Sequence, residues 1–330
     1  MSGAGTMEAG RKARAAQPIA IVGAGSIGVA WALVFARAGH PVALHDPDPA
    51  RLAAAPRELD ERLATLRAHG LLDEPVQTVA ARVGIATELG GALAGALHVQ
   101  ECAPERVELK RELFERLDAL ADPSATLASS SSALTASRFA AELPGRARVL
   151  IAHPGNPPYL LPVVELVPAP FTAAETVARA QALFTAAGMA PVLVRAEVEG
   201  FLFNRLQGAV LREAYCLVRD GVATVEDVDR VMRDGLGRRW AAIGPFETVD
   251  LNTRGGIASH AEKMGPAYAR MGAERGQDDP WTPELVAEVE AQRRALLPLE
   301  QWEARVVWRD ETLMAAQARA ARPADDEDAA

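Results

Sequence analysis

The feature that most constrains the fold of this chain is a glycine-rich turn near its N-terminal end, Gly23-Ala24-Gly25-Ser26-Ile27-Gly28. An apolar run at residues 19–22 precedes the turn, and a longer apolar stretch at 29–38 follows it. This pattern predicts a strand, a tight turn and a helix that ends at Gly39. A second apolar run at 41–45 leads to Asp46, which lies 18 residues after Gly28. The rest of the chain is organised around this unit.

The three glycines of the turn have separate roles in binding a dinucleotide. Gly23 permits the sharp turn, Gly25 lets a pyrophosphate approach the backbone, and Gly28 lets the helix pack closely on the strand. The free N–H groups and the positive dipole at the start of the helix face the phosphates. Asp46 stands close to the position where such folds place an acid against the ribose hydroxyls. A glycine turn without a nucleotide is the less favoured alternative.

The acid at the end of the second strand also selects the cofactor. Asp46, with Asp48 beside it, would repel the 2′-phosphate of NADP. Arg51 is the nearby residue that argues for NADP, and we expect it on a solvated helix face. The sequence therefore predicts NAD.

The composition narrows the class of protein. The chain has 330 residues, of which 49% are hydrophobic, so it can bury a large core and form two domains. A net charge of −9 gives no support to nucleic-acid binding. Cys102 and Cys216 make neither a disulfide framework nor a metal site, and a reduced, cytoplasmic setting is the simplest interpretation. We find no signal peptide in the first 17 residues and no run near the roughly 20 apolar residues of a membrane span.

Beyond Asp46, strand and helix patterns alternate. We expect strands at 80–87, 97–102, 127–130, 148–152, 163–167 and 191–195, and a helix at 134–143 among others. The alternation predicts an α/β fold with a Rossmann-type, doubly wound, mostly parallel sheet. Helical patterns at 204–221, 225–234 and 283–297 then predict an all-helical C-terminal domain. The predicted organisation is a disordered tail at 1–17, a nucleotide-binding domain at 18–199, a helical domain at 200–320 and a disordered acidic tail at 321–330.

Polar residues that follow strands are the candidates for chemistry, because open parallel sheets bind ligands beyond the carboxyl ends of their strands. The run Ser129-Ser130-Ser131-Ser132 offers hydroxyls for a substrate oxygen, although such a run is more often a loop or a helix cap. His153 begins a loop with three prolines and a glycine in seven residues, a rigid setting for one histidine. Asn204 opens the helical domain, either as a helix N-cap or as an amide that faces the cleft.

A carboxylate interrupts one apolar strand. Glu165 stands in Val163-Val164-Glu165-Leu166-Val167, where a buried carboxylate needs a partner. His153 is the obvious partner, and a histidine held by a carboxylate can accept a proton during alcohol oxidation. The alternative is an ion pair between Glu165 and an arginine.

Seven segments, in order and at family spacing, resemble the 3-hydroxyacyl-CoA dehydrogenase family. They read GAGSIG, QECAPERVELKRELFERLD, ASSSSAL, HPGNPPYLLPVVELVP, GFLFNRLQ, EAYCLVRDGVATVEDVD and DGLGRRWAAIGPFET. The resemblance covers residues 18–317 and is greatest to the lambda-crystallin branch, which includes L-gulonate 3-dehydrogenase. Acyl-CoA members read His-Phe-Phe-Asn-Pro where this chain has His-Pro-Gly-Asn-Pro-Pro, with Gly155 in place of the valine usual in the branch.

The resemblance implies roles for individual residues. His153 matches the general base and Glu165 its partner, while Ser132 and Asn204 match residues that contact the substrate oxygen. Glu105 and Lys110 match residues at the nicotinamide side of NAD, with Ser26, Ile27 and Asp46 at the phosphate and adenosine side. Arg239 matches an arginine of the branch that could hold a substrate carboxylate through a bidentate contact, although Arg238 beside it blurs this assignment. The family also implies a homodimer through the helical domain.

The reaction expected from the resemblance is NAD-dependent oxidation of the C3 hydroxyl of a small 3-hydroxy acid, with L-gulonate favoured. A 3-hydroxyacyl-CoA is the first alternative, and the arginines of residues 51–67 could bind its phosphates. Carnitine is the second, with Tyr159, Trp240 and Phe246 available for its quaternary ammonium group. The non-enzymatic alternative is a crystallin-like, NAD-binding structural protein.

Overall fold

The computed structural model describes residues 17–276, 282–305 and 308. The tails predicted at 1–17 and 321–330 lie outside these residues, apart from Gln17. The chain divides into two compact units, Met1–Leu211 and Arg212–Ala330. No helix in the described ranges is long and apolar enough to cross a membrane.

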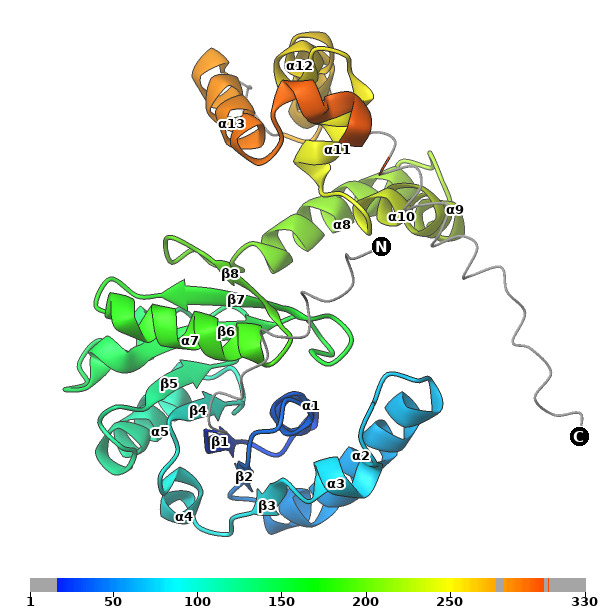
Figure 1. The fold of residues 1–330 in the computed structure, drawn as a ribbon. Coiled ribbons are helices and arrows are strands. Elements are labelled where there is room, and N and C mark those ends of the chain that lie inside the picture. The colour runs from blue at the N-terminus through cyan, green and yellow to red at the C-terminus, as the bar shows by residue number, and fades with distance from the viewer. Residues whose placement is uncertain (1–16, 277–281, 306–307, 309–330) are drawn as a thin grey trace, which may run out of the picture. The chain divides into compact units, whose positions relative to one another are not determined.

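The first unit is built on one eight-stranded sheet with the strand order β3-β2-β1-β4-β5-β6-β7-β8 (Figure 1). The strands are β1 (Ile19–Val22), β2 (Val42–His45), β3 (Val83–Ile85), β4 (His98–Glu101), β5 (Thr126–Ser129), β6 (Val149–Pro154), β7 (Val163–Pro168) and β8 (Ala190–Leu193). Every neighbouring pair is parallel except β6 and β7. The predicted Rossmann-type, doubly wound, mostly parallel sheet is confirmed.

The reversed strand β7 has a local cause. Only residues 155–162 join β6 to β7, too few for the crossover helix that a parallel pair needs, so the two strands run antiparallel. The turn is tight at Gly155, where a Cβ atom would lie 3.0 Å from Leu161 and Val163. The antiparallel register places His153 directly opposite Glu165.

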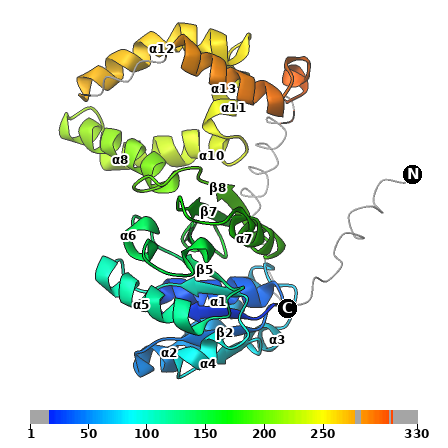
Figure 2. The same cartoon turned by 90° about the vertical axis from the view of Figure 1, so that its left-hand side faces the viewer.

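Helices cover both faces of the sheet (Figures 1 and 2). One apolar cluster joins the sheet to α1 (Ser26–Arg37), α2 (Pro49–Ala68), α3 (Val76–Ala80) and α7 (Ala174–Ala186). A second cluster joins it to α4 (Leu89–Leu93), α5 (Val107–Leu120) and α6 (Ser137–Ala140). Alternate β1 residues enter the two clusters, Ile19 and Ile21 the first and Ala20 and Val22 the second, as expected for a sheet covered on both sides.

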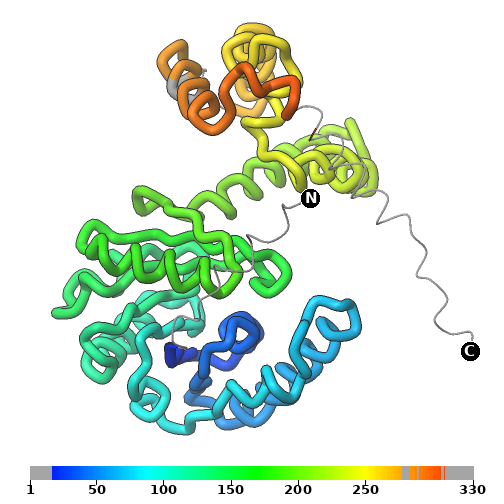
Figure 3. The backbone as a smooth tube through the Cα atoms, in the orientation of Figure 1, coloured from blue at the N-terminus to red at the C-terminus, as the bar shows by residue number. Residues whose placement is uncertain are grey.

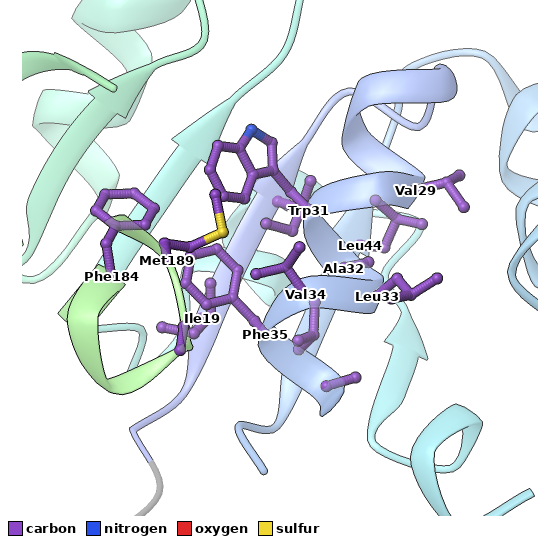
Figure 4. Close-up of a cluster of buried hydrophobic side chains, with 14 of the residues drawn as sticks. Ile19, Val29, Trp31, Ala32, Leu33, Val34, Phe35, Leu44, Phe184 and Met189 are labelled. Atoms are coloured by element: carbon purple, nitrogen blue, oxygen red, sulfur yellow. The ribbon is translucent and has the colours of Figure 1, made fainter. Parts of the chain in front are cut away.

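Helix α1 is enclosed by protein along most of its length. Residues 28–36 are all buried, which explains why the helix is apolar all round rather than on one stripe. The rings of Trp31 and Phe35 stack at 5.6 Å between centroids, and Phe184 of α7 lies 5.3 Å from Trp31 (Figure 4). This packing holds the N-terminus of α1 firmly at the end of β1.

Two elements of the first unit differ from expectation. The helix predicted at 134–143 is reduced to the four residues of α6, because the backbone N–H of Leu134 donates to Glu105 and its carbonyl oxygen accepts from Ser131, which holds Leu134 in a loop. The strand predicted at 80–87 is only the three-residue edge strand β3, preceded by α3 (Figure 1). Figure 3 traces the backbone as a tube in the same orientation.

The second unit is helical in all its described elements. Helix α8 (Phe203–Arg219) crosses the division between the units. The following elements are α9 (Val225–Arg230), a π-helical segment (Val231–Leu236), α10 (Gly237–Trp240), α11 (Pro245–Asn252), α12 (Gly256–Glu274) and α13 (Pro283–Leu296). The sequence pattern does not indicate α12, because Gly256, Gly265 and Pro266 interrupt it. No helix is predicted from the sequence at α11 either.

His98 is a buried titratable group, and it leads to a prediction about stability. Its ring lies 5.8 Å from that of Phe35 and 5.5 Å from that of Phe184, and burial lowers its pKa from 6.5 to about 4 despite a hydrogen bond with Gln100. Between these pH values the unfolded chain binds a proton that the folded protein does not, so stability falls as the pH drops. We expect a loss of about 2 kcal/mol between pH 7 and pH 5 from this group.

Urea unfolding at both pH values measures this loss. His98→Phe should remove most of it, whereas the exposed His69→Gln should keep it. The same loss in His98→Phe as in the wild type would contradict the assignment.

Candidate active site

A cleft of about 640 Å³ opens at the carboxyl edge of the sheet. It is lined by Val22 at the end of β1, His45 at the end of β2, and Cys102 and Ala103 directly after β4. β1 and β4 are neighbours at the point where the strand order reverses, which is the usual ligand site of an open α/β sheet. Burial raises the pKa of Cys102 to about 12, so the thiol in this cleft is neutral.

The glycine turn has the shape that a pyrophosphate requires. Gly23 has a φ of 112°, and a Cβ atom there would lie 2.9 Å from the backbone of Cys102. A Cβ atom on Gly28 would lie 1.7 Å from the carbonyl oxygen of Gly23, so neither glycine can be replaced without displacing the turn. A Cβ atom on Gly25 would meet only a guanidinium nitrogen of Arg51, at 3.3 Å. The backbone at Gly25 is therefore open on its cleft side.

Asp46 also lies in this cleft. Its carboxylate accepts hydrogen bonds from the backbone N–H groups of Ala24, at 2.7 Å, and Asp48, at 2.9 Å. Arg51 is 59% exposed, as expected, but its guanidinium also reaches the rim of the cleft. The open glycine backbone, the helix N-terminus and the carboxylate together fit NAD.

Ser26 and Ile27 follow the second glycine. Arg62 of α2 donates to the hydroxyl of Ser26, at 2.8 Å, and to its carbonyl oxygen, at 2.9 Å. Ile27 is half-buried and packs against the first apolar cluster. Contacts of these two residues with the cofactor stay predictions.

Lys110 is enclosed by oxygen atoms in the interior of the first unit. Its side chain is 1% exposed, and its ammonium group donates to Glu101 at 2.8 and 2.9 Å, to the Ala103 carbonyl at 3.3 Å and to the Ser129 hydroxyl at 3.4 Å. The predicted contact between Lys110 and the nicotinamide stays a prediction. Its partner Glu101 was missed in the sequence, because it ends the strand His98–Glu101, which reads HVQE and is buried but not apolar.

Glu105 holds the loop that follows the serine run. Its carboxylate accepts hydrogen bonds from the Ser131 hydroxyl at 2.5 Å and from the backbone N–H groups of Ala133 at 3.0 Å and Leu134 at 2.9 Å. Burial alone would raise the pKa of Glu105, but these hydrogen bonds lower it below its ordinary value. Glu105 is thus a fixed anion beside Ser132, and its predicted contact with NAD stays a prediction.

The four serines have different surroundings. Ser129 donates to Glu101 at 2.5 Å, Ser130 accepts from the indole N–H of Trp31 at 3.1 Å, and Ser131 donates to Glu105. Ser132 is exposed, and no hydrogen bond joins its hydroxyl to another group in the described part of the chain. Its hydroxyl is therefore free for a ligand, as the prediction for a substrate oxygen requires.

His153 and Glu165 form a buried hydrogen-bonded pair. Nδ1 of His153 lies 2.7 Å from Oε2 of Glu165, and the side chains are 8% and 3% exposed. The partnership expected between the two side chains is present, rather than an arginine ion pair. An Nδ1–H that donates to the carboxylate leaves Nε2 as the nitrogen that can accept a proton.

The other oxygen of Glu165 is held by the start of α8. Oε1 accepts hydrogen bonds from the backbone N–H groups of Leu202 at 2.7 Å and Phe203 at 2.9 Å. Burial alone would raise the pKa of Glu165, but hydrogen bonds from His153 and these two N–H groups lower it below its ordinary value. Glu165 is therefore ionised at neutral pH.

The side-chain amide of Asn204 donates to the Ser132 carbonyl at 3.0 Å. The structure thus brings together Ser132, His153, Glu165 and Asn204 within the first unit.

Arg239 belongs to the second unit. It lies on α10 and is half-buried, and its Nε atom has no hydrogen-bond partner among the described residues. That Nε atom is itself buried, and the binding of a substrate carboxylate by Arg239 stays a prediction. Within the described ranges, no group of three or more His, Cys, Asp or Glu side chains could hold a metal ion.

Known proteins resemble the chain over most of its length. Residues 18–198 match the NAD-binding domain of 3-hydroxyacyl-CoA dehydrogenase, and residues 200–296 match the C-terminal domain of that family. A lambda-crystallin homolog of Bos taurus is 41% identical over 300 residues, which cover 90% of this chain and 93% of the relative.

Two further relatives carry names of dehydrogenases. An L-carnitine dehydrogenase of Streptomyces coelicolor is 37% identical over 276 residues, 82% of this chain and 83% of its own. The crystal structure of 3-hydroxybutyryl-CoA dehydrogenase from Escherichia coli is 32% identical and superposes with a TM-score of 0.63 over 72% of this chain and 49% of that one. The cleft, the two domain matches and these relatives lead to one conclusion: the chain is an NAD-dependent oxidoreductase and belongs to the 3-hydroxyacyl-CoA dehydrogenase family, in its lambda-crystallin branch.

Proposed function

We propose that the protein oxidises the C3 hydroxyl of a small 3-hydroxy acid, with L-gulonate, oxidised to 3-dehydro-L-gulonate, as the favoured substrate. The observation that carries this proposal is the buried pair of His153 and Glu165 at the carboxyl edge of the sheet that also forms the NAD cleft. The likeness to the lambda-crystallin homolog supports the gulonate branch over the acyl-CoA members.

The proposed mechanism assigns one task to each side chain. Bound NAD supplies the hydride acceptor. Nε2 of His153 takes the proton of the C3 hydroxyl, and the ionised Glu165 stabilises the imidazolium that forms. The Ser132 hydroxyl and the Asn204 amide hold the substrate oxygen as it becomes a carbonyl oxygen. Arg239 is proposed to bind the carboxylate of the acid.

The arginines of α2 support a free acid over a CoA thioester. Every arginine that α2 contains already has a partner in the described structure: Arg51 pairs with Asp48, Arg57 with Glu61, Arg62 with Glu58 and Ser26, and Arg67 with the carbonyls of Leu72 and Asp73. Binding of the CoA phosphates would require these arginines to exchange their present partners for phosphate oxygens. The helix therefore offers no preformed cluster of unpaired arginines.

Carnitine is the second candidate, because the L-carnitine dehydrogenase is similar over most of the chain. The ring of Tyr159 already faces the guanidinium of Arg62, at 5.8 Å from its centroid, so it is less available to a quaternary ammonium group. A structural protein without turnover is the remaining alternative, and the grouping of Ser132, His153, Glu165 and Asn204 argues against it.

Initial rates of NAD reduction with L-gulonate, 3-hydroxybutyrate, carnitine and a 3-hydroxyacyl-CoA test the proposal. We expect the highest kcat/KM with L-gulonate and a loss of that preference in Arg239→Ala, with Arg238→Ala as the neighbouring control. A higher kcat/KM for carnitine or the thioester would reassign the substrate. No turnover with any of the four would favour the structural protein.

The cofactor choice leads to a separate prediction for Asp46. Asp46→Ser should weaken NAD binding and reduce the preference over NADP, because the charge that opposes a 2′-phosphate is removed while a hydroxyl can still accept the hydrogen bond from Ala24. Dissociation constants for both cofactors, measured by fluorescence titration, give the ratio. Asp60→Ser on α2 is the control, and an unchanged ratio in Asp46→Ser would contradict the role.

We also propose a cytoplasmic homodimer in which residues 18–199 bind NAD and residues 200–320 bind substrate and form the dimer. Helix α8 supports this, because none of its residues is buried and Leu206 and Leu211 are 63% and 45% exposed. Leu202 and Val210 extend the same apolar set. A monomer in light scattering at micromolar concentration would contradict the dimer.

A further inference from the structure

The segment that hydrogen-bonds to the Glu165 carboxylate, residues 200–203, has an unusual backbone conformation. Gly200 has a φ of 76° and Phe201 a φ of 50°, and Phe201 is the one non-glycine residue in the described part of the chain with a positive φ. A bulky residue with this conformation is strained unless its surroundings enforce it, and such positions concentrate at functional sites. The strain lies directly before the two residues whose N–H groups bind Glu165.

The left-handed turn aims two successive amides at one oxygen atom. The Leu202 and Phe203 N–H groups both reach Oε1 of Glu165, at 2.7 and 2.9 Å. Successive N–H groups after a left-handed residue form a concave binding site for an anion. Because Oε1 is held here, the orientation of the carboxylate is fixed, and Oε2 is directed to Nδ1 of His153 at 2.7 Å.

Phe201 also packs on the histidine itself. Its side chain is 0% exposed, and the centroid of its ring lies 5.5 Å from that of His153. The Phe201 ring belongs to the second apolar cluster, so a simple packing role is the competing explanation. The two explanations differ in whether the backbone conformation or the ring volume matters for the pair.

We propose that the left-handed turn at Gly200 and Phe201 is a positioning element for the His153–Glu165 pair. Both residues act through the pair, by the backbone contacts to Glu165 and by the packing of the Phe201 ring on His153, so they are positioning residues. The inference rests on the proposed function of the pair as general base. It goes beyond that function by proposing that the backbone conformation of Gly200 and Phe201, which do not react themselves, orients the base.

Phe201→Gly and Phe201→Val separate the two explanations. Glycine adopts a positive φ freely but leaves the volume of the ring empty, whereas the β-branched valine fills more of that volume but resists a positive φ. If the turn positions the pair, kcat falls further in Phe201→Val, and we expect a difference of about tenfold between the variants. KM for NAD should change in neither. If packing alone matters, Phe201→Gly is the poorer enzyme, and this result would overturn the proposal.

Gly200→Ala tests the turn without altering the ring. Its new Cβ atom would meet nothing closer than 3.5 Å, so the substitution acts through the positive φ alone. Gly188→Ala is the matched control, because Gly188 has a φ of 79° and open space around it at the end of α7. Gly200→Ala should lower kcat and Gly188→Ala should not. This comparison also decides the question if Phe201→Val does not fold.

A spectroscopic measurement keeps the inference distinct from the catalytic proposal. The Nδ1 proton of His153, shared with a buried carboxylate, should give a far-downfield ¹H NMR resonance that Glu165→Gln shifts. We expect this resonance in Phe201→Gly and Gly188→Ala, and its loss or displacement in Phe201→Val and Gly200→Ala. An unchanged resonance in the latter two would refute the positioning role. Turnover retained in His153→Ala would instead refute the proposed base and leave this measurement valid.

Discussion

His153→Ala should lower kcat by about 10²–10⁴-fold, the usual contribution of a positioned proton acceptor. The expected loss follows from the geometry of the buried pair, in which Glu165 engages Nδ1 and leaves Nε2 to accept the proton of the alcohol. NAD binding should be unchanged, because His153 is not among the residues that line the cofactor cleft. Steady-state kinetics with the favoured acid and a separate NAD titration measure the two effects.

The companion variant Glu165→Gln tests the electrostatic part of the same mechanism. Glutamine retains an oxygen that can accept from the Leu202 and Phe203 N–H groups, but it has no charge to stabilise an imidazolium. We therefore expect a lower kcat with a folded protein. The exposed His69→Ala serves as the control for loss of a histidine. Turnover near the wild-type value in His153→Ala would disprove the proposed base, whatever the behaviour of Glu165→Gln.

Lys110→Met should destabilise the protein by about 3–5 kcal/mol, the usual result of removing one partner from a buried ion pair. Glu101 is 0% exposed, and without the ammonium group its charge remains in the interior with only the Ser129 hydroxyl and the Ala103 N–H as donors. Urea unfolding at neutral pH gives the free energy of unfolding. Because the lost interaction is interior, added salt should not restore it.

Two further variants show whether the effect of Lys110→Met on stability comes from the loss of the buried ion pair. The double variant Glu101→Gln with Lys110→Met removes both charges and keeps an acceptor for Ser129, so it should recover much of the loss. Lys263→Met replaces the other lysine in the described ranges, which is exposed, and should change stability by less than about 0.5 kcal/mol. Equal effects of Lys110→Met and Lys263→Met would show that the buried pair contributes little.

The features that could be predicted from the sequence are mainly those fixed by residues within one short segment of the chain. The glycine turn and its helix could be predicted because Gly23, Gly25 and Gly28 act within one continuous segment. The partnership of His153 with Glu165 could be predicted, with an arginine as the alternative partner, because a carboxylate in an apolar strand needs a partner and His153 lies twelve residues before it. The direction of β7 was not predicted, although the ten residues between the strands predicted at 148–152 and 163–167 are too few for the crossover helix of a parallel pair.

Other features depend on partners that the strand and helix patterns do not identify. Glu101 and Lys110 lie only nine residues apart, but the pattern of neither β4 nor α5 indicates that their side chains meet. The different surroundings of the four serines likewise depend on Trp31 in α1, Glu101 in β4 and Glu105 in the loop before α5. Helix α12 contains Gly265 and Pro266, which usually interrupt helices, so tertiary packing decides its extent.

The enclosure of α1 limits how the protein can be re-engineered. Because residues 28–36 are all buried, a new polar group on this helix would need a hydrogen-bond partner inside the domain. Directed evolution toward another dinucleotide would therefore have to work through the surface-accessible positions around Asp48 and Arg51. Libraries that randomise α1 would consist mainly of proteins that misfold.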